Sequence, residues 1–522
     1  MGLEFDFVIV GAGSAGCAAA YQLGAANVGT IAVLEAGQTN QVPQVKIPFL
    51  LAWTRGSKRD WKFDSRPQME LGDRSVGVTR GKMIGGSSSI NSMVWFRGRR
   101  DDFDNWNVPG WAWKDVVGAF EEIEELIDPQ PFPTPHPLSS AYALALGDNG
   151  DAPPTPEREG AGIFHVNLHD GARWSAADAF LEPAKRTGRV EVLTQANADK
   201  IIFGDGNQAR QVALTDDRIV TARRGILLSA GSIGSPSILM RSGIGPAGHL
   251  QQLGITVHSD QSGVGGNLHD HPAVGLHYSG ARTGYGVELA QLPNWAVSPL
   301  NWFFRRKGRL ASNIVEAGAF FRANPVGPDG DDRPDCQSHF IPVKMGYKGT
   351  FLAWGSGYSA DVNICRPFSR GRLRLVTSEP HTPPDIDLAL LRDKRDLTTM
   401  INGVKRLRET IAGAPFGDLR GIEEYPGDRI QSDEDIEQFV RDRCATAYHP
   451  VGTLRMGDGR SPVSSRMAMR GGENLWVADA SVMPAVTTAN TNAPSMMIGY
   501  RAGRMIVEDV SQSVRYRGSR RE

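Results

Sequence analysis

The sequence predicts an α/β fold, and the clearest evidence lies in its first forty residues. Residues 5–10 are mostly apolar and include three β-branched residues in a row, which is typical of a buried strand. A glycine-rich run, 11–16, follows directly, and the small residues of 17–23 then predict a helix. Residues 28–34 predict a second apolar strand, which ends at Glu35. This alternation of strand and helix favours the α/β class.

The glycine-rich run has the Gly-x-Gly-x-x-Gly spacing of a loop that holds a dinucleotide. Gly11 permits the tight turn, Gly13 leaves no side chain between the backbone and a pyrophosphate, and Gly16 lets helix and strand pack closely. The N-terminus of the helix offers free N–H groups and a positive dipole end to the phosphates. Glu35 lies about where a carboxylate binds the adenosine ribose. Because this carboxylate would repel a 2′-phosphate, FAD or NAD is favoured over NADP.

Composition limits the class of protein and of partner. The chain has 522 residues, 40% hydrophobic and 22% charged, which is enough for two or three domains of ordinary globular composition. A net charge of −1 gives no sign of a nucleic-acid partner. No apolar run approaches the roughly 18 residues that a membrane span requires. The four cysteines are scattered without metal-ligand spacing, so we expect no metal site and a cytoplasmic location.

Further along the chain, a second small-residue stretch lies at 81–91 between apolar residues, which suits a backbone pressed against a flat ligand. Residues 113–127 predict an amphipathic helix, and the Pro- and Gly-rich segments between 128 and 162 predict loops. Residues 224–229 predict a strand that leads into a helix at 236–241. Pro236 would then occupy the first turn of that helix, where a missing N–H costs least.

The central block, about 273–440, has a mixed pattern and predicts a second domain. Its clearest elements are strands at 315–322 and 372–376 and an amphipathic helix at 396–411. After it come a histidine followed by proline at 449–450 and a polar run at 487–494. A final helix is predicted at 495–507.

Several of these stretches together resemble the glucose–methanol–choline (GMC) family of FAD-dependent alcohol oxidoreductases, and nearly the whole chain takes part. The most specific matches are 81–91 and 231–245. The segments 264–272, 448–457 and 479–494 are similar to family segments near the flavin and in the active site. Among members, the chain is most similar to bacterial choline dehydrogenase-like and aryl-alcohol oxidase-type enzymes.

The resemblance implies a Rossmann-like FAD-binding domain and a substrate domain with an antiparallel sheet and helices. Residues 1–275 would form the N-terminal part of the FAD domain, 276–445 the substrate domain, and 446–510 a return that completes the active site. It also implies a set of residues that bind FAD: Gly11, Gly13, Ser14, Gly16, Glu35, Gly85, Gly86, Asn91, Ala198, Asp479 and Asn492.

The sequence departs from the family pattern at two places, and each departure leads to a further expectation. Members with covalently attached flavin have a histidine in the second glycine-rich stretch, and Ile90 stands at that position here. We therefore expect non-covalent FAD. The segment from about 129 to 162 is shorter than in most members, which leaves its role in substrate entry or oligomer contacts open.

The resemblance also implies the catalytic residues. His449 matches the family's base, and a neutral imidazole suits proton abstraction near neutral pH. Asn492 matches the polar residue that orients the alcohol oxygen, whereas Asn490 is interpreted as turn chemistry. Glu316 falls where choline-oxidising relatives place a carboxylate that faces the substrate cation. His269 and His271 are expected mainly to hold loop structure.

The sequence thus predicts oxidation of a small primary alcohol to the aldehyde, by proton transfer to His449 and hydride transfer to the flavin. The acceptor that reoxidises the flavin would be oxygen or a quinone-type carrier. The alternative function is that of a hydroxynitrile lyase, because the same fold hosts lyases that keep FAD without redox turnover. The identity of the alcohol and the oligomeric state stay open.

Overall fold

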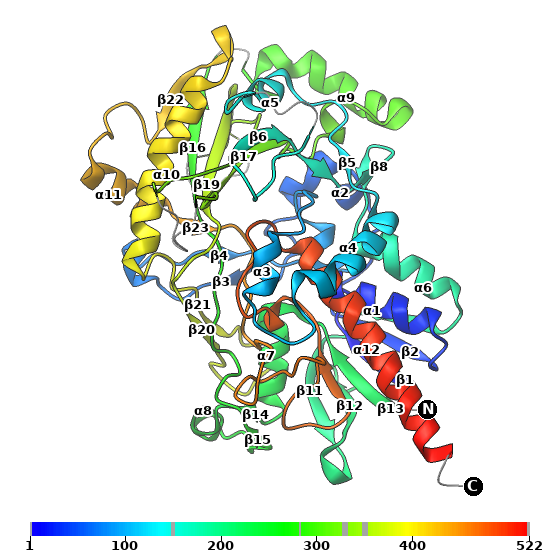
Figure 1. Cartoon of the computed structure of the whole chain (residues 1–522). Helices are drawn as coiled ribbons and strands as arrows, with labels where there is room; N and C mark the ends of the chain where they lie inside the picture. Colours follow the sequence, from blue (N-terminus) through cyan, green and yellow to red (C-terminus); the bar gives the residue numbers. More distant parts are fainter. Residues whose placement is uncertain (1–2, 148–151, 281–282, 326–331, 347–352, 519–522) are drawn as a thin grey trace.

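Two β-sheets organise the chain, one in the lower half and one in the upper half of the view in Figure 1. This computed structural model describes residues 3–147, 152–280, 283–325, 332–346 and 353–518. Several segments cross from one sheet to the other, so neither sheet is built from one continuous stretch of chain.

The first sheet has the strand order β10-β2-β1-β13-β12-β11, and β24 pairs with β13. The four strands from β10 to β13 are parallel, whereas β12 and β11 are antiparallel to their neighbours. β1 and β2 lie inside the sheet. All of β2 is buried, and β1 is buried at Phe5 and over residues 7–10, which explains their apolar sequences. The strands are β1 (Leu3–Val10), β2 (Ile31–Glu35), β10 (Val190–Thr194), β11 (Ala198–Phe203), β12 (Ala209–Leu214), β13 (Ile219–Leu228) and β24 (Leu475–Val477).

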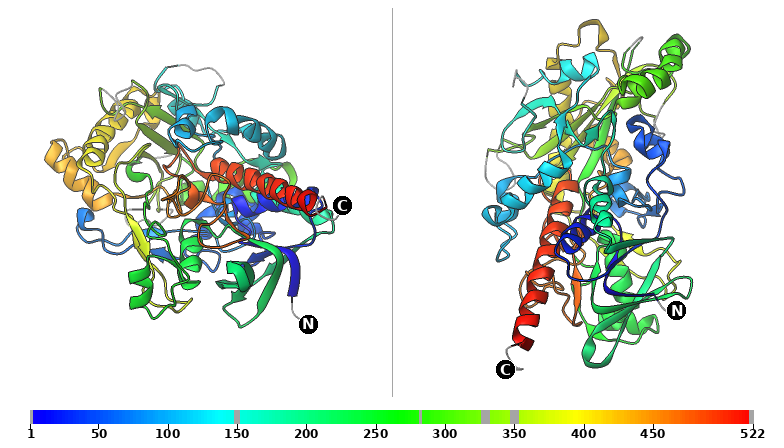
Figure 2. Two further views of the ribbon diagram at one scale, coloured as in Figure 1. Left: turned by 60° about the horizontal axis from the view of Figure 1, so that its bottom comes forward. Right: turned by 90° about the vertical axis from the view of Figure 1, so that its right-hand side faces the viewer.

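The last helix of the chain packs against the first. α12 (Asn492–Gly518) lies beside α1 (Ser14–Ala25) in both Figure 1 and Figure 2. The two backbones approach closely because Gly499 faces α1, where a Cβ atom would lie 2.1 Å from the carbonyl oxygen of Ala15. The C-terminal segment therefore reaches the glycine-rich turn at the start of the chain.

The second sheet is antiparallel, in the order β22-β16-β19-β18-β17-β6, with β23 paired to β16. α10 (Lys394–Gly413) packs on it, and Gly403 lets the helix approach Val362 and Cys336. The strands are β6 (Gly160–Ile163), β16 (Pro272–Ser279), β17 (Ala317–Phe321), β18 (Cys336–Ile341), β19 (Gly357–Ile364), β22 (Ile422–Tyr425) and β23 (Ala445–Thr446).

Shorter elements connect and flank the two sheets. The remaining helices are α2 (Pro43–Lys46), α3 (Arg100–Asp104), α4 (Trp113–Ile127), α5 (Pro137–Tyr142), α6 (Glu182–Arg186), α7 (Gly231–Arg241), α8 (Ala247–Gln252), α9 (Leu292–Arg305) and α11 (Asp433–Arg443). Two-stranded pairs are formed by β3 (Phe63–Asp64) with β4 (Gly77–Val78), β5 (Gln130–Pro131) with β7 (His165–Val166), β8 (Leu168–His169) with β9 (Ala172–Arg173), β14 (Ile244–Gly245) with β15 (Ser259–Asp260), and β20 (Arg372–Arg374) with β21 (Asp385–Asp387).

The predicted fold class, a parallel-sheet nucleotide domain with a second antiparallel domain, is confirmed. The domain boundary at 275/276 stays a prediction, and one strand complicates it. β6 comes from the segment that predicted loops, yet it forms the edge of the second sheet beside β17.

The helix expected at 236–241 begins earlier than predicted, at Gly231. Pro236 therefore lies inside α7, where it cannot donate to the carbonyl of Ser232. The hydroxyl of Thr453 donates to that carbonyl instead, at 2.7 Å. The C-terminal segment thus satisfies the group that proline leaves without a helical partner. Within the described part of the chain, no helix has the length and apolar character needed to cross a bilayer.

Candidate active site

Two cavities lie between the sheets and share part of their walls. One is a trough of about 400 Å³ along the carboxyl ends of β1 and β2, and the other is a pocket of about 350 Å³ at the loop after β23. Both are lined by Ser14, Arg80, Ser87, Ala480 and Ser495. An elongated ligand could therefore extend from the trough into the pocket.

The first glycine-rich turn forms the floor of the trough. Gly11 has φ +104°, and a Cβ atom there would lie 2.5 Å from the carbonyl oxygen of Ser229. Gly16 is equally restricted, since its Cβ would meet the carbonyl oxygen of Gly11 at 2.0 Å. Gly13 caps α1 without a side chain, so the first N–H groups of that helix face the trough without a side-chain partner. This arrangement suits a phosphate.

Glu35 lines the trough at the end of β2. Its carboxylate accepts hydrogen bonds from the backbone N–H of Ala12 at 3.1 Å and of Gly37 at 2.8 Å. Burial raises the pKa of Glu35 to about 7, although both N–H groups act in the opposite direction. Ala198, the first residue of β11, also lines the trough. Both residues thus line the trough, and their contact with a nucleoside stays a prediction.

The second glycine-rich stretch lies against the first. A Cβ atom on Gly86 would approach the Cα of Gly13 to 2.7 Å, so the two loops are in backbone contact. Gly86 lines the trough and Asn91 lines the pocket, whereas Gly85 lines neither cavity. The side chain of Asn91 is held by protein, since its oxygen accepts from Met93 N–H at 3.0 Å and from Arg173 at 2.8 Å.

Asp479 lines the trough but directs its carboxylate to protein donors. One oxygen accepts from the Gly231 N–H at 2.9 Å and from the Ser235 hydroxyl at 2.6 Å, and the other accepts from the Ser481 N–H. Burial raises the pKa of this carboxyl. Asp479 therefore fixes the start of α7 beside the trough.

His449 lines the pocket in the loop after β23, and its backbone is anchored by Asp270. Its backbone N–H donates to the Asp270 carboxylate at 2.9 Å, and the Thr446 hydroxyl donates to the other oxygen of that carboxylate. The predicted segment 264–272 thus contributes by holding the histidine loop. Burial, followed by the neighbouring His271, His339 and Arg80, lowers the pKa of His449 well below its ordinary value of 6.5.

The hydrogen bonds of two rings assign the proton on His449. His271 Nε2 lies 3.1 Å from the carbonyl oxygen of Thr487, which can only accept, so this nitrogen carries the proton. In neutral His271 the Nδ1 is then an acceptor, and it faces His449 Nδ1 at 3.1 Å. His449 therefore donates from Nδ1, and its Nε2 carries no proton and can only accept.

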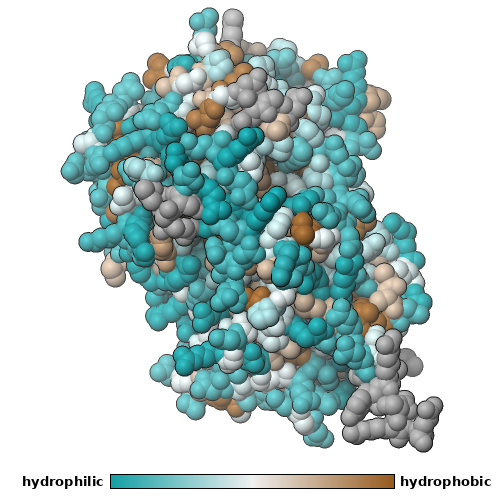
Figure 3. Space-filling model, viewed as in Figure 1, coloured by the Kyte–Doolittle hydropathy of each residue, from teal (hydrophilic) through white to brown (hydrophobic). Residues whose placement is uncertain are grey.

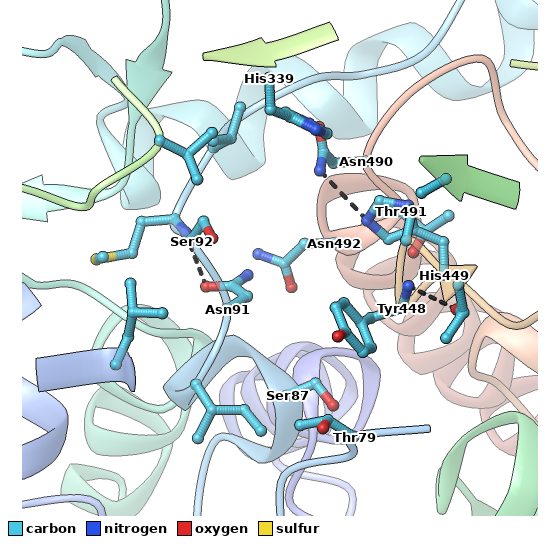
Figure 4. Close-up of a pocket in the computed structure, with 18 of the residues that line it drawn as sticks. Thr79, Ser87, Asn91, Ser92, His339, Tyr448, His449, Asn490, Thr491 and Asn492 are labelled. Atoms are coloured by element: carbon cyan, nitrogen blue, oxygen red, sulfur yellow. Dashed lines mark hydrogen bonds between the residues drawn. The ribbon is translucent and has the colours of Figure 1, made fainter. Parts of the chain in front are cut away.

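Asn490, rather than Asn492, contacts the ring of His449. Its amide nitrogen lies 3.2 Å from His449 Nε2, as the dashed line in Figure 4 shows. Asn492 begins α12 and accepts a hydrogen bond from the Ser14 hydroxyl at 2.7 Å, on the side of the trough. Its amide nitrogen is buried without a hydrogen-bond partner in the described structure. The predicted interpretation of Asn490 as turn chemistry is therefore wrong for its side chain.

A histidine and an aspartate on the second sheet were missed in the sequence. His339 on β18 and Asp361 on β19 both line the pocket, and Asp361 accepts from His339 Nδ1 at 3.1 Å. Although burial disfavours the His339 cation, Asp361 raises its pKa above the ordinary value. His339 Nε2 faces the Asn490 oxygen at 3.5 Å, and Gln337 donates to the same oxygen at 3.2 Å. These contacts orient the amide so that its N–H points toward His449.

Glu316 does not line the pocket, contrary to its predicted contact with a substrate cation. Its carboxylate is fully buried and accepts hydrogen bonds from four groups within the protein. These are the hydroxyls of Ser139, Tyr285 and Ser312 and the backbone N–H of His136. A strand places alternate side chains on opposite faces, and Glu316 precedes β17 on the face that packs against α5.

The two histidines of the 264–272 segment have different roles. His269 accepts from the Val486 N–H at 2.9 Å and lies 2.6 Å from the carbonyl of Asn267, which holds loop structure as expected. His271 instead contacts His449 directly, as described above.

Comparison with known proteins gives the family. Residues 5–273 and 367–499 match the N- and C-terminal models of GMC oxidoreductases. The chain belongs to the GMC oxidoreductase family. Its relatives include an alcohol dehydrogenase (acceptor) from Pseudomonas putida, 36% identical over 98% of this chain and 97% of the relative. An oxygen-dependent choline dehydrogenase from Rhizobium johnstonii is also 36% identical, over 97% and 96% of the two chains.

Solved structures agree with this assignment. A variant of Aspergillus oryzae formate oxidase, studied for its FAD modification, matches with a TM-score of 0.87 and 25% identity, over 97% of this chain and 99% of the other. As a member of the GMC family, the present chain has FAD as its cofactor, and the residues that line the trough fit a dinucleotide. The bare N-terminus of α1 and the buried Glu35 carboxylate in the trough, with the unpartnered amide of Asn492 in the adjoining pocket, are groups that a dinucleotide would meet.

Proposed function

We propose that this GMC oxidoreductase oxidises a neutral primary alcohol to the aldehyde, with His449 as the base. The observation that supports this most is the unprotonated Nε2 of His449, which is left as an acceptor because Nδ1 donates to His271, in a residue that lines the pocket. A base must be uncharged to accept a proton, and the lowered pKa of His449 keeps the imidazole neutral at physiological pH.

Asn490 is proposed as the donor to the alcohol oxygen. Its amide nitrogen lies 3.2 Å from His449 Nε2, and an alcohol hydroxyl that replaced this hydrogen bond could accept from Asn490 and donate to His449. His339 and Gln337 fix the amide in this orientation. The role that the sequence assigned to Asn492 is therefore proposed for Asn490.

Asn492 is proposed to act on the cofactor side of the site. When bound, FAD supplies a flavin ring that accepts the hydride from the alcohol carbon. Asn492 and Ser14 are hydrogen-bonded to each other where the trough meets the pocket. The buried amide nitrogen of Asn492 could donate a hydrogen bond to the cofactor there.

The lining of the pocket supports a neutral substrate with an aliphatic body. Its apolar wall includes Leu51, Ile90, Met93, Val94, Ile314, Val315, Ile341 and Met345. Among the described residues of the lining, Asp361 is the one carboxylate, and it is bonded to His339. Arg55 and Arg80 add positive charge. A quaternary ammonium ion would find neither a free carboxylate nor an aromatic cage, so choline is not the proposed substrate.

Anaerobic mixing with alcohols tests this function. A primary aliphatic alcohol should bleach the flavin absorbance, whereas choline at the same concentration should bleach it far more slowly. A lyase would keep its flavin oxidised with every alcohol, and that result would reject the proposal in favour of the alternative function. Faster bleaching by choline than by aliphatic alcohols would reject the proposed substrate class.

We propose that oxygen or a quinone-type carrier reoxidises the flavin after it has accepted the hydride from the alcohol. An oxygen electrode separates the two, because only the oxidase reaction consumes oxygen in the presence of the alcohol alone.

A further inference from the structure

α9 is an amphipathic helix whose apolar side faces away from the protein. Among its 14 residues, Ser298 is the only one that is fully buried, with Trp295 and Trp302 partly buried beside it on the same face. The opposite face, at spacings of three and four residues, is apolar and exposed. Its large side chains are Leu292 (53% exposed), Val297 (48%), Leu300 (58%), Phe303 (64%) and Phe304 (74%).

The inward face fixes the helix to the rest of the protein through both tryptophans. The indole N–H of Trp295 donates to the carbonyl of Gly286 at 2.7 Å, and that of Trp302 donates to the carbonyl of Gly171 at 2.8 Å. The ring of Trp295 also packs on Phe49 at 5.0 Å. Because both tryptophans point inward, the orientation of the apolar outer face is determined.

Basic residues follow the apolar face directly. Arg305, Arg306 and Lys307 are all exposed, and Arg306 lies over the ring of Trp302 at 4.3 Å. The sequence from 289 to 309 contains four basic residues and no acidic one. The overall charge of −1 hides this local concentration of positive charge.

The face of the molecule seen in Figure 3 is mostly hydrophilic with scattered apolar residues. In Figures 1 and 2, α9 lies at the outer edge of the second domain. A helix with leucine and phenylalanine on one side and arginine and lysine beside it has the composition of segments that lie in the interface of a membrane.

We propose that α9 docks this enzyme on the surface of an anionic lipid membrane. The aromatic and aliphatic side chains of the outer face would enter the boundary between headgroups and acyl chains, and Arg305, Arg306 and Lys307 would pair with anionic headgroups. The net positive charge of the segment argues for this occupant over a second copy of the chain, which would bring like charges together.

The active-site pocket lies close to the same surface. Phe49, which packs on Trp295, belongs to the 3₁₀ turn Pro48–Trp53. Leu51 in that turn lines the pocket, and Trp53 is 51% exposed at its end. Docking through α9 would therefore bring this wall of the pocket near the lipid.

Sedimentation with vesicles tests the proposal on the complete holoenzyme. Vesicles of phosphatidylcholine alone should retain little protein, whereas equal parts of phosphatidylcholine and phosphatidylglycerol should retain most of it. The double variant Phe303→Asp/Phe304→Asp should lose at least roughly tenfold in vesicle affinity, because two large apolar side chains no longer enter the interface. Arg305→Glu/Lys307→Glu should remove the preference for the anionic vesicles.

A matched control places the same charges on apolar residues elsewhere. Met69 and Ile422 are 80% and 70% exposed, and Met69→Asp/Ile422→Asp should bind vesicles like the wild type. All variants should keep wild-type turnover of a water-soluble alcohol. The proposal would be overturned if the wild-type protein bound to neither kind of vesicle. Light scattering could instead show a dimer for the wild type and a monomer for Phe303→Asp/Phe304→Asp, with vesicle binding unchanged in the variant. That result would also overturn the proposal and would favour a contact between two copies of the chain.

Discussion

His449 combines a low pKa with a defined tautomer, and both can be tested. Replacement by alanine should slow flavin reduction by the alcohol by roughly 10²–10⁴-fold, because the proton acceptor is lost. In the wild type, the pKa of His449 lies well below 6.5. The imidazole therefore stays neutral as the pH falls through 6.5, and the acid limb of the rate of flavin reduction should lie below that pH.

Anaerobic stopped-flow absorbance measures both effects. His249→Ala, in α8, is a suitable control because His249 lines neither cavity. That variant should reduce its flavin at the wild-type rate. An acid limb at or above pH 6.5 would contradict the assigned environment of His449, and near-normal reduction in His449→Ala would contradict its role as base.

The two asparagines at 490 and 492 should fail in different ways. Asn490→Ala removes the donor beside His449 and should slow flavin reduction by roughly 10²-fold or more, with FAD retained. Asn492→Ala removes the acceptor for Ser14 and should mainly weaken FAD binding. Flavin content and reduction rate, measured on both variants, make each the control for the other. The reverse pattern would restore the role that the sequence assigned to Asn492.

At this scale, the sequence predicted residues with local roles and failed where the choice depended on distant partners. The glycines of the first turn and Glu35 lie within one strand–helix–strand unit, so their spacing was sufficient to place them together, and their role in binding FAD stays a prediction. Asn490 and Asn492 are two amides in one polar run, and the start of α12 decides which reaches His449. His339 and Asp361 meet only through the pairing of β18 with β19, which leaves no local signal.

Among the elements, α7 depends on a hydroxyl group from another part of the chain. Thr453→Val keeps the shape of the side chain but leaves the buried carbonyl of Ser232 without the partner that Pro236 denies it. We expect a loss of about 1–3 kcal/mol in the free energy of unfolding. The midpoint of urea unfolding of the holoenzyme, followed by tryptophan fluorescence, should shift to lower urea.

Thr410→Val provides the matched control for this element. Thr410 is also buried, and its hydroxyl donates to the carbonyl of Arg406 inside α10, which keeps its helical N–H partner. This variant should lose less than Thr453→Val. Equal losses in the two variants would show that the bond to Ser232 has no special importance.

The elements themselves were predicted unevenly, for physical reasons. The helix at 113–127 was predicted with the bounds of α4, because one face packs on the protein and the other meets water. α9 was not predicted, since its tryptophans face inward and its phenylalanines face outward, which removes the usual polar face. β6 is short and glycine-rich, and only its pairing with β17 makes it a strand.

At the scale of the whole molecule, the sequence predicts that FAD is bound without a covalent bond, and a single experiment can test this. Ile90 lines the pocket where covalently flavinylated relatives have histidine, and its hydrocarbon side chain cannot form a bond to the flavin. The thiols offer no substitute, because all four cysteines are buried and none lines either cavity. The protein should therefore hold FAD by contacts alone.

Acid precipitation of the purified holoenzyme should then release the flavin absorbance into the supernatant, and the denatured chain should have the mass of its residues alone. Unfolding in guanidinium followed by gel filtration provides the control, since it separates trapped flavin from bonded flavin. Flavin that stays with the chain in both procedures would require a covalent bond to another residue of the pocket. His449, His339 and Tyr448 line the pocket and are candidates for that residue, and peptide mass mapping would distinguish them.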